Sequence, residues 1–395
     1  MLPADAVTMT PRERVLAALA HRQPDRTPRD LGGTTATGIN IVAYRNLVNH
    51  LGLAEDVTFG NERARLANIS DAVLTRFGSD TRPVMPGSAY NVGQANPDGT
   101  FTDGYGIVRG LPDERGHYYV VTAPLVGEIS RGDIAAAARG WPDPDDPAHT
   151  AGVAETARRL HRDACYAVIL NLPLGSTHQA QWLRGFDNWL ADLVLDPQLS
   201  IYLLDLLFER WLEMTRRLLA VAGRDVDVLF YGEDVAFHTG PMVSPRTYEK
   251  IIHPYQRRVF DALHSLSDAK LLYHCCGAVA WQINDLIEMG VDALNPVQVS
   301  SAGMDDTAAL KRRFGDRIAF WGGVDTGHVL PYGSPQDVRD EVRRRIGDLP
   351  GRRLRAGGRA QPPGRRVAGE HLRAVGCGRW VAQNANRRSQ IANRR

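Results

Sequence analysis

Short apolar runs of strand length alternate with amphipathic helical segments along this chain, and few folds accommodate such a pattern. Continuous apolar runs bounded by glycine, proline or polar residues are typical of parallel strands that are covered on both faces. Repeated strand–helix units of this kind predict an α/β fold, either a (β/α)8 TIM barrel or a doubly wound sheet. The runs lie at residues 81–85, 166–172, 226–231, 270–273, 293–299 and 318–321.

Helix-start signals separate these runs. Thr10-Pro11-Arg12-Glu13 has the residues of a capping box, and Ser244-Pro245 and Ser334-Pro335 are further starts. A long amphipathic helix is predicted over residues 197–222. The segment from about 88 to 126 instead contains turn residues, such as those at 96–99, and predicts an insertion of hairpins.

Polar residues gather where the apolar runs end. In a barrel the carboxyl ends of all strands meet at one rim, and catalytic residues lie there. We therefore favour a single-domain barrel over residues 1–350. The rim candidates are Asn171, Glu233, Asp234, His274, Cys275, Cys276, Asn295, Gln298 and Asp325.

The segment Tyr273-His274-Cys275-Cys276-Gly277 predicts a metal site. In an extended segment His274 and Cys276 point to the same side. Imidazole nitrogen and thiolate sulfur are both ligands that Zn²⁺ accepts, so the pair could supply two ligands of a tetrahedral site. The alternative is a cysteine packed as a small apolar residue beside a hydrogen-bonded histidine.

Four acidic residues have open alternatives. Glu233 and Asp234 follow a strand and could form an acid/base pair or anchor a cationic group. Alternatively, they belong to a solvated turn or cap a helix. Asp325, after Gly322-Gly323, could orient a ligand or cap a helix, and Asp30 in DLGGTT has the same ambiguity. His238, in the apolar segment after Asp234, is a substrate-binding candidate with a structural role as its alternative.

Composition excludes several classes of protein. Of the 395 residues, 43% are hydrophobic and 23% charged, which suits a globular enzyme with a large core. No run of about 18 apolar residues predicts a membrane span, and the first residues do not resemble a secretory signal. Four cysteines, two of them adjacent, make a poor disulfide framework and favour a reducing cytoplasm.

The net charge of +2 conceals an asymmetry. Residues 351–395 contain 12 of the 47 basic residues and one of the 45 acidic residues, which leaves residues 1–350 with a net charge of −9. Basic tails often bind nucleic acid. We do not expect a nucleic-acid partner for this tail.

Several colinear segments resemble the uroporphyrinogen decarboxylase superfamily, and within it the methyltransferase-like branch. The resemblance covers residues from about 10 to 350 and implies one (β/α)8 barrel with its site at the carboxyl rim. The segments are MTPRERVLAALAHRQPDRTPRDLGGT, FGSDTRPV, FYGEDVAFHTGPMVSPRTYEKIIHPYQRR, LLYHCCGAV, MGVDALNPVQ and FWGGVDTGHVLPYGSPQDVRDEVRRRI.

The resemblance implies two possible reactions on a small-molecule substrate. In the methyltransferase branch a His-x-Cys pair and a later ligand hold zinc, which activates a thiol that takes a methyl group from a corrinoid partner protein. The true decarboxylases act on uroporphyrinogen without a cofactor and have an arginine motif where this chain has DLGGTT. Residues 1–350, with a net charge of −9, would bind a polyanionic substrate poorly, so we favour methyl transfer.

These considerations give a set of candidate residues. His274 and Cys276 are the predicted zinc ligands, and the later cysteine of the branch is not evident. The predicted catalytic residues are Asp234, Glu233 and Asp325, and the predicted substrate-binding residues are Asp30, Asp80, Asn171, His238 and Asn295.

The chain after Pro350 departs from the family. Members continue with a last strand and helix similar to GGGYVLAPVHNIQPDVPPENI, whereas this chain has GRRLRAGGRAQPPGRRVAGEHL. Codons shifted by one base permit GGGYVLAAVHNLQADVSPENI over the same stretch. We therefore hypothesise that residues 351–395 are frame-shifted, that the last strand–helix unit is missing, and that the chain as written is an unstable homologue with little or no activity. Coding DNA without this alternative frame would refute the hypothesis.

Overall fold

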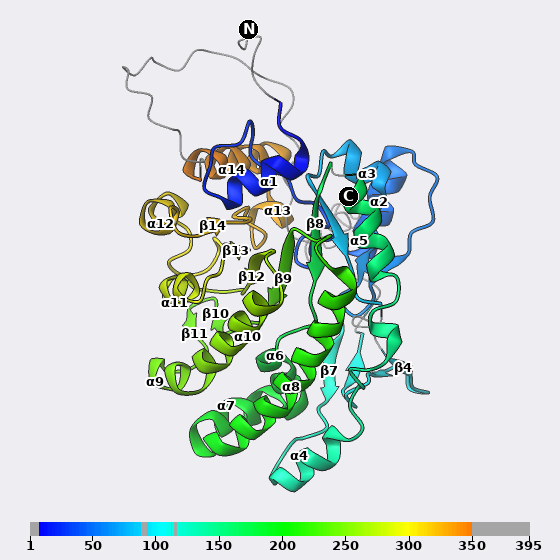
Figure 1. The fold of residues 1–395 in the computed structure, drawn as a ribbon, viewed down its shortest axis with the longest axis vertical. Helices are drawn as coiled ribbons and strands as arrows, with labels where there is room; N and C mark the ends of the chain where they lie inside the picture. Colours follow the sequence, from blue (N-terminus) through cyan, green and yellow to red (C-terminus); the bar gives the residue numbers. More distant parts are fainter. Residues whose placement is uncertain (1–7, 88–92, 112, 114–116, 164, 350–395) are drawn as a thin grey trace, which may run out of the picture.

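The computed structural model describes residues 8–87, 93–111, 113, 117–163 and 165–349 (Figure 1). At its centre is a parallel sheet with the strand order β14-β13-β12-β9-β8-β3. This sheet confirms the predicted parallel α/β architecture, and within the described residues it is open between β14 and β3. The strands are β3 (Thr81–Val84), β8 (Ala167–Asn171), β9 (Val228–Gly232), β12 (Lys270–His274), β13 (Ala293–Asn295) and β14 (Ala319–Phe320).

The two faces of the sheet are both covered, which explains why its strands are continuously apolar. Alternate residues, among them Ile169, Phe230 and Leu272, pack on the inner face with Val15 and Leu19 of the first helix. The residues between them pack against the outer helices, and include Val168, Leu170, Leu229, Tyr231, Leu271, Tyr273 and Leu294.

Helices connect the strands and cover the outer face (Figure 1). The predicted helix over 197–222 is confirmed as α8, and the capping boxes at Thr10 and Ser334 are formed. The helices are α1 (Pro11–Leu19), α2 (Ile41–Leu51), α3 (Asp71–Arg76), α4 (Arg131–Ala138), α5 (Val153–Arg162), α6 (Ser176–Arg184), α7 (Phe186–Leu195), α8 (Pro197–Ala222), α9 (Pro245–Thr247), α10 (His253–Leu266), α11 (Ile283–Glu288), α12 (Thr307–Phe314), α13 (Val329–Tyr332) and α14 (Pro335–Asp348), with a 3-10 turn at Pro147–His149 and a π-helical turn at Tyr248–Ile252.

One predicted strand is shorter in the structure. The run at 293–299 leaves the sheet after Asn295, because Pro296 has no N–H for the ladder. The segment before Asp30 has no regular strand conformation. It is nevertheless attached to the start of β3, since the Asp80 N–H donates to the carbonyl oxygen of Arg29 at 2.7 Å.

Smaller sheets lie outside the central one. Within the segment where hairpins were expected, four antiparallel strands have the order β4-β5-β6-β7. Two further pairs are β1 with β2 and β10 with β11. The bounds are β1 (Phe59–Asn61), β2 (Leu66–Ala67), β4 (Gln94–Ala95), β5 (Phe101–Thr102), β6 (Val108–Gly110), β7 (Tyr119–Thr122), β10 (Ala236–Phe237) and β11 (Gly240–Pro241).

The predicted frame-shifted segment, residues 351–395, lies outside the described residues. Among the helices that are described, none has the length and apolar character needed to cross a bilayer.

Candidate metal centre

Three neighbouring strands bring the central candidate residues together. β12 lies between β9 and β13, with His274 in register with Gly232 on one side and with Asn295 on the other. The residues that follow each strand therefore meet at one edge of the sheet. Asp234 comes from the end of β9, and His274 and Cys276 come from the end of β12.

The extended chain at the end of β12 separates the two adjacent cysteines. Cys275 is fully buried in the outer core, and its sulfur accepts the N–H of Val235 at 3.5 Å. Burial raises the pKa of the Cys275 thiol well above its ordinary value, which disfavours a thiolate. Cys276 is only partly buried, and its sulfur lies 3.4 Å from Nε2 of His274. The predicted pairing of His274 with Cys276, rather than Cys275, is therefore the one that the backbone provides.

Hydrogen bonds orient the imidazole of His274. The side-chain amide of Asn295 donates to the carbonyl oxygen of Trp321 at 2.9 Å, which turns Oδ1 of Asn295 toward His274. Nδ1 of His274 lies 2.6 Å from that oxygen and must carry the proton. The lone pair is then on Nε2, on the side of Cys276. Histidines that bind metals commonly have this arrangement, with the second ring nitrogen donating to an oxygen.

Asp234 completes a group of three potential ligands. One ligand atom from each of Asp234, His274 and Cys276 lies within 4.8 Å of the others. The N–H of Cys276 donates to Oδ1 of Asp234 at 2.8 Å, and this bond fixes the carboxylate beside the pair. From the sequence, Asp234 is a catalytic candidate and no third ligand is evident, because the contact depends on the register between β9 and β12.

The turn after Cys276 requires glycine. Gly277 has a φ of +96°, and a Cβ atom there would lie 2.7 Å from the carbonyl oxygens of Ala236 and Phe237. The Gly277 N–H donates to Oε1 of Gln298 at 2.7 Å. Gln298 also lies 3.3 Å from Nε2 of His238, so a short polar chain extends outward from the centre.

Glu233 points away from this centre. Its Oε1 accepts a bond from Gln256 at 2.9 Å, within a buried polar cluster that also contains Tyr248, Tyr273 and Gln282. Burial raises the pKa of Glu233, and hydrogen bonds from Gln256, Thr177 and Tyr231 lower it by less. The adjacent carboxylates of Glu233 and Asp234 are therefore not brought together as a pair.

Asp30 and Asn171 hold the loop that faces β14. Oδ1 of Asp30 accepts the Thr81 hydroxyl at 2.6 Å, and its Oδ2 accepts the indole N–H of Trp321 at 2.9 Å. Burial raises the pKa of Asp30. Asn171 accepts from the N–H of Thr35 and donates to the carbonyl of Gly33, so it fixes the same loop. Trp321, which is not among the candidates from the sequence, connects Asp30 to Asn295.

Asp80 and Asp325 are not brought to the centre. Asp80 precedes β3, at the opposite end of the strand, where Arg14 and Arg26 each lie within 2.7 Å of its carboxylate. Asp325 accepts the N–H groups of Gly327 and His328, both at 2.8 Å, in the turn before α13. These bonds hold a turn ahead of α13, whose N-cap is His328 without a side-chain capping bond, so Asp325 orders the turn and does not cap the helix.

The fold and the site together define the class of this protein. It is a parallel α/β protein with polar groups at the carboxyl ends of its strands. The sequence matches the uroporphyrinogen decarboxylase (URO-D) family over residues 133–354, more than half of the chain. The chain belongs to this family. Among solved structures its fold is similar to that of a methyltransferase from Methanosarcina mazei, with a TM-score of 0.60 and 15% identity over 97% of this chain and 99% of that one. The comparison with curated proteins gave no match.

Proposed function

We propose that the chain binds zinc through Asp234, His274 and Cys276, and that this centre, once the reading frame is restored after residue 350, catalyses methyl transfer from a methyl-corrinoid protein to a thiol. The observation that carries this proposal is the convergence of the three side chains at the carboxyl end of β12, with ligand atoms within 4.8 Å of one another. One of its structural neighbours is a methyltransferase, which is compatible with this reaction.

The donor set fits zinc. One sulfur, one nitrogen and one oxygen suit an ion of borderline softness and leave a fourth tetrahedral position for a substrate. Bonds of about 2.0 Å to nitrogen and about 2.3 Å to sulfur give a tetrahedral edge of about 3.5 Å. The observed separation of 3.4 Å between the His274 nitrogen and the Cys276 sulfur is close to that edge.

Each residue has a defined part in this proposal. Asn295 keeps the proton of His274 on Nδ1, so that Nε2 is available as a ligand. Asp234 holds the Cys276 backbone through its N–H. Zinc bound here would lower the pKa of an acceptor thiol and so supply the nucleophile for the methyl group.

Cofactor-free decarboxylation is the second candidate, because the family description names that activity. A polycarboxylate substrate needs cationic partners, and residues 1–350 have a net charge of −9. The two candidates differ in one simple property, since the decarboxylase reaction requires no metal.

Metal analysis with matched cysteine variants tests the proposal. Zinc is measured after dialysis of the full chain and of His274→Ala, Cys276→Ala and Cys275→Ala. We expect close to one zinc per chain in the parent and in Cys275→Ala, and loss of zinc in the other two. Equal zinc in all four proteins, or none in the parent, would contradict the site.

The reaction is tested separately. The protein for this assay, the parent of its variants, has the reading frame restored after residue 350. Methylcobalamin serves as methyl donor and a simple alkanethiol as acceptor, and the thioether product is measured. We expect product from the parent and from Cys275→Ala, and none from Cys276→Ala. Stoichiometric zinc without thioether would keep the metal site and overturn the reaction.

A further inference from the structure

The turn that carries Cys276 is held on both sides of this residue. The N–H of Cys276 donates to Oδ1 of Asp234 at 2.8 Å, and the N–H of Gly277 donates to Oε1 of Gln298 at 2.7 Å. The two peptide groups next to the Cα atom of Cys276 are planar, and each is therefore constrained by one of these bonds. Because the two planes set the direction of the Cα–Cβ bond, rotation about χ1 is the main freedom left to the sulfur.

The strand ladder cannot supply the second of these bonds. β12 and β13 pair as far as His274 and Asn295, and the Cys275 N–H still donates to the carbonyl oxygen of Asn295 at 3.0 Å. β13 ends at that residue, before it could pair with Gly277. Gly277 is buried, and a buried N–H without an acceptor is unfavourable. The side chain of Gln298 therefore takes the place of the strand as acceptor.

The loop that carries Gln298 is itself held in place. The Gly323 N–H donates to the carbonyl oxygen of Pro296 at 2.8 Å, and the Ser301 N–H donates to that of Gln298 at 2.9 Å. Between these bonds Val297 has a φ of +54°, and it is buried. A β-branched residue adopts this conformation only where the surrounding structure determines it. The loop therefore presents Gln298 from a fixed position.

His238 determines which end of the Gln298 amide faces the turn. Nε2 of His238 lies 3.3 Å from Nε2 of Gln298, and its Nδ1 lies 3.4 Å from Oγ of Ser301. Since the amide oxygen of Gln298 accepts the Gly277 N–H, its NH₂ group donates to the imidazole. The imidazole is held in turn, because the Ala302 N–H donates to the carbonyl oxygen of His238 at 2.8 Å. A reversed amide would lose both bonds.

We infer that Gln298 is the positioning residue of Cys276, and that His238 sets the orientation in which Gln298 acts. Gln298 acts through the turn after Cys276, whose sulfur lies 3.4 Å from Nε2 of His274. Asn295, at the start of the same loop, orients the imidazole of His274, so one loop sets both ligands that β12 provides. The inference rests on the proposed zinc site and is independent of methyl transfer.

Cobalt in place of zinc tests this role. The dialysed full-length chain and its variants are titrated with Co²⁺, because a thiolate–cobalt bond gives a near-ultraviolet charge-transfer band that reports the sulfur ligand. We expect Gln298→Ala to bind cobalt about 10- to 100-fold more weakly, with a weaker band. Gln298→Glu keeps an acceptor oxygen and should retain the band and most of the affinity. Gln336→Ala is the matched control, because Gln336 is exposed on α14 and bonds to Asp340 there.

The part of His238 is tested by a double variant. In His238→Ala the amide of Gln298 can reverse, so we expect weaker cobalt binding than in the parent. In the Gln298→Glu background both side-chain oxygens are acceptors, and His238→Ala should have no further effect. An equal loss in both backgrounds would overturn the part given to His238.

Amide hydrogen exchange in the metal-free chain measures the hold on the turn directly. We expect the segment 274–280 to exchange faster in Gln298→Ala than in the parent and in Gln336→Ala. Unchanged exchange, or a lower melting temperature of Gln298→Ala with the cobalt affinity and band of the parent, would overturn the inference. A parent that takes up no cobalt would instead overturn the metal site itself and, with it, this role of Gln298.

Discussion

The candidate centre depends on a few side chains whose orientation is fixed by neighbours. His274 presents Nε2 to Cys276 because Asn295 occupies Nδ1, and Asn295 is itself held by the carbonyl of Trp321. The chemistry of the site thus rests on a hydrogen-bond chain across β12, β13 and β14. Residues that touch no ligand contribute to ligand affinity in such an arrangement.

Replacing Asn295 by alanine tests this chain. The imidazole loses its acceptor, so both its tautomer and its orientation become less defined. We expect zinc affinity to fall by about 10- to 100-fold. Competition with a chromophoric chelator measures it, and Asn295→Asp, which keeps an acceptor oxygen, should bind zinc at least as tightly as the alanine variant. Unchanged zinc affinity in Asn295→Ala would show that Asn295 does not contribute to zinc binding.

Glu233 gives a prediction about pH. Its pKa is raised by burial, so between the unfolded and folded pKa values the folded state holds a proton that the unfolded state has lost. Its contribution to stability is therefore present at low pH and is lost as the pH rises through the folded value. We expect the melting temperature of Glu233→Gln, relative to that of the parent, to increase as the pH rises from 4 to 8. Parallel curves would show that the group does not titrate on unfolding.

The sequence allowed prediction of some of this site and not of the rest. The choice of Cys276 over Cys275 needed only the two-residue period of an extended chain. Asp234 as a third ligand and Asn295 as the partner of His274 depend on register between strands far apart in sequence. The position of Glu233 depends on burial, and that of Asp80 depends on an arginine far away in the sequence. A local sequence pattern reveals neither.

At the scale of elements, local signals predicted helices better than strand ends. Capping residues and apolar stripes placed α1, α8 and α14, because these signals lie within each helix. The end of β13 at Asn295 was missed, although Pro296 marks it. The attachment of α1 to the start of β3 was also hidden, since it is made by the ion pair of Arg14 with Asp80. Arg26, which follows α1, pairs with the same carboxylate.

Asp80→Asn tests the attachment of α1. Asp80 is fully buried and the Arg14 side chain is only 5% exposed, so the variant leaves a buried guanidinium with less compensation. We expect a loss of about 3 kcal/mol in the free energy of unfolding, with zinc binding retained in the folded fraction. Chemical denaturation measures the loss. The exposed pair of Arg343 with Asp340 is the control, and Asp340→Asn should change stability little.

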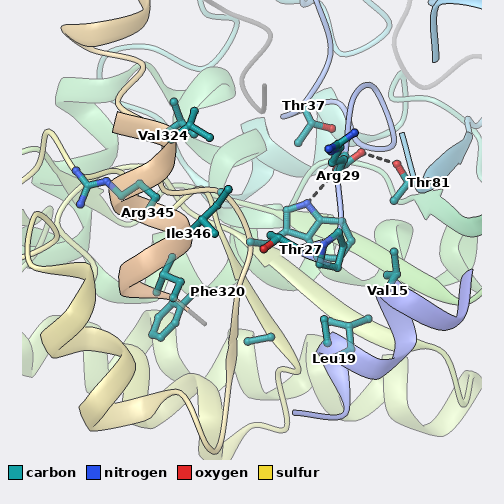
Figure 2. A pocket seen from close by; sticks show the side chains of 18 residues that line it. Val15, Leu19, Thr27, Arg29, Thr37, Thr81, Phe320, Val324, Arg345 and Ile346 are labelled. Carbon is teal, nitrogen blue, oxygen red and sulfur yellow. Dashed lines mark hydrogen bonds between the residues drawn. The ribbon is translucent and has the colours of Figure 1, made fainter. Parts of the chain in front are cut away.

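At the scale of the whole molecule, the described chain has a parallel sheet that is open between β14 and β3, with a mostly apolar cavity beside β14 (Figure 2). Open edges and exposed apolar surface reduce stability and favour association between chains. We expect the chain as written to melt below about 50 °C, at the low end for mesophilic domains. Restoring the frame after residue 350 should raise the melting temperature by about 10 °C or more. A cooperative melt of the present chain above that limit would contradict this account.

X-ray absorption at the zinc edge tests the central claim most directly. We expect one zinc per chain with one sulfur at about 2.3 Å and nitrogen or oxygen ligands at about 2.0–2.1 Å. The sulfur should disappear from the spectrum in Cys276→Ala and remain in Cys275→Ala. A zinc shell without sulfur, or one that Cys276→Ala leaves unchanged, would contradict the proposed centre.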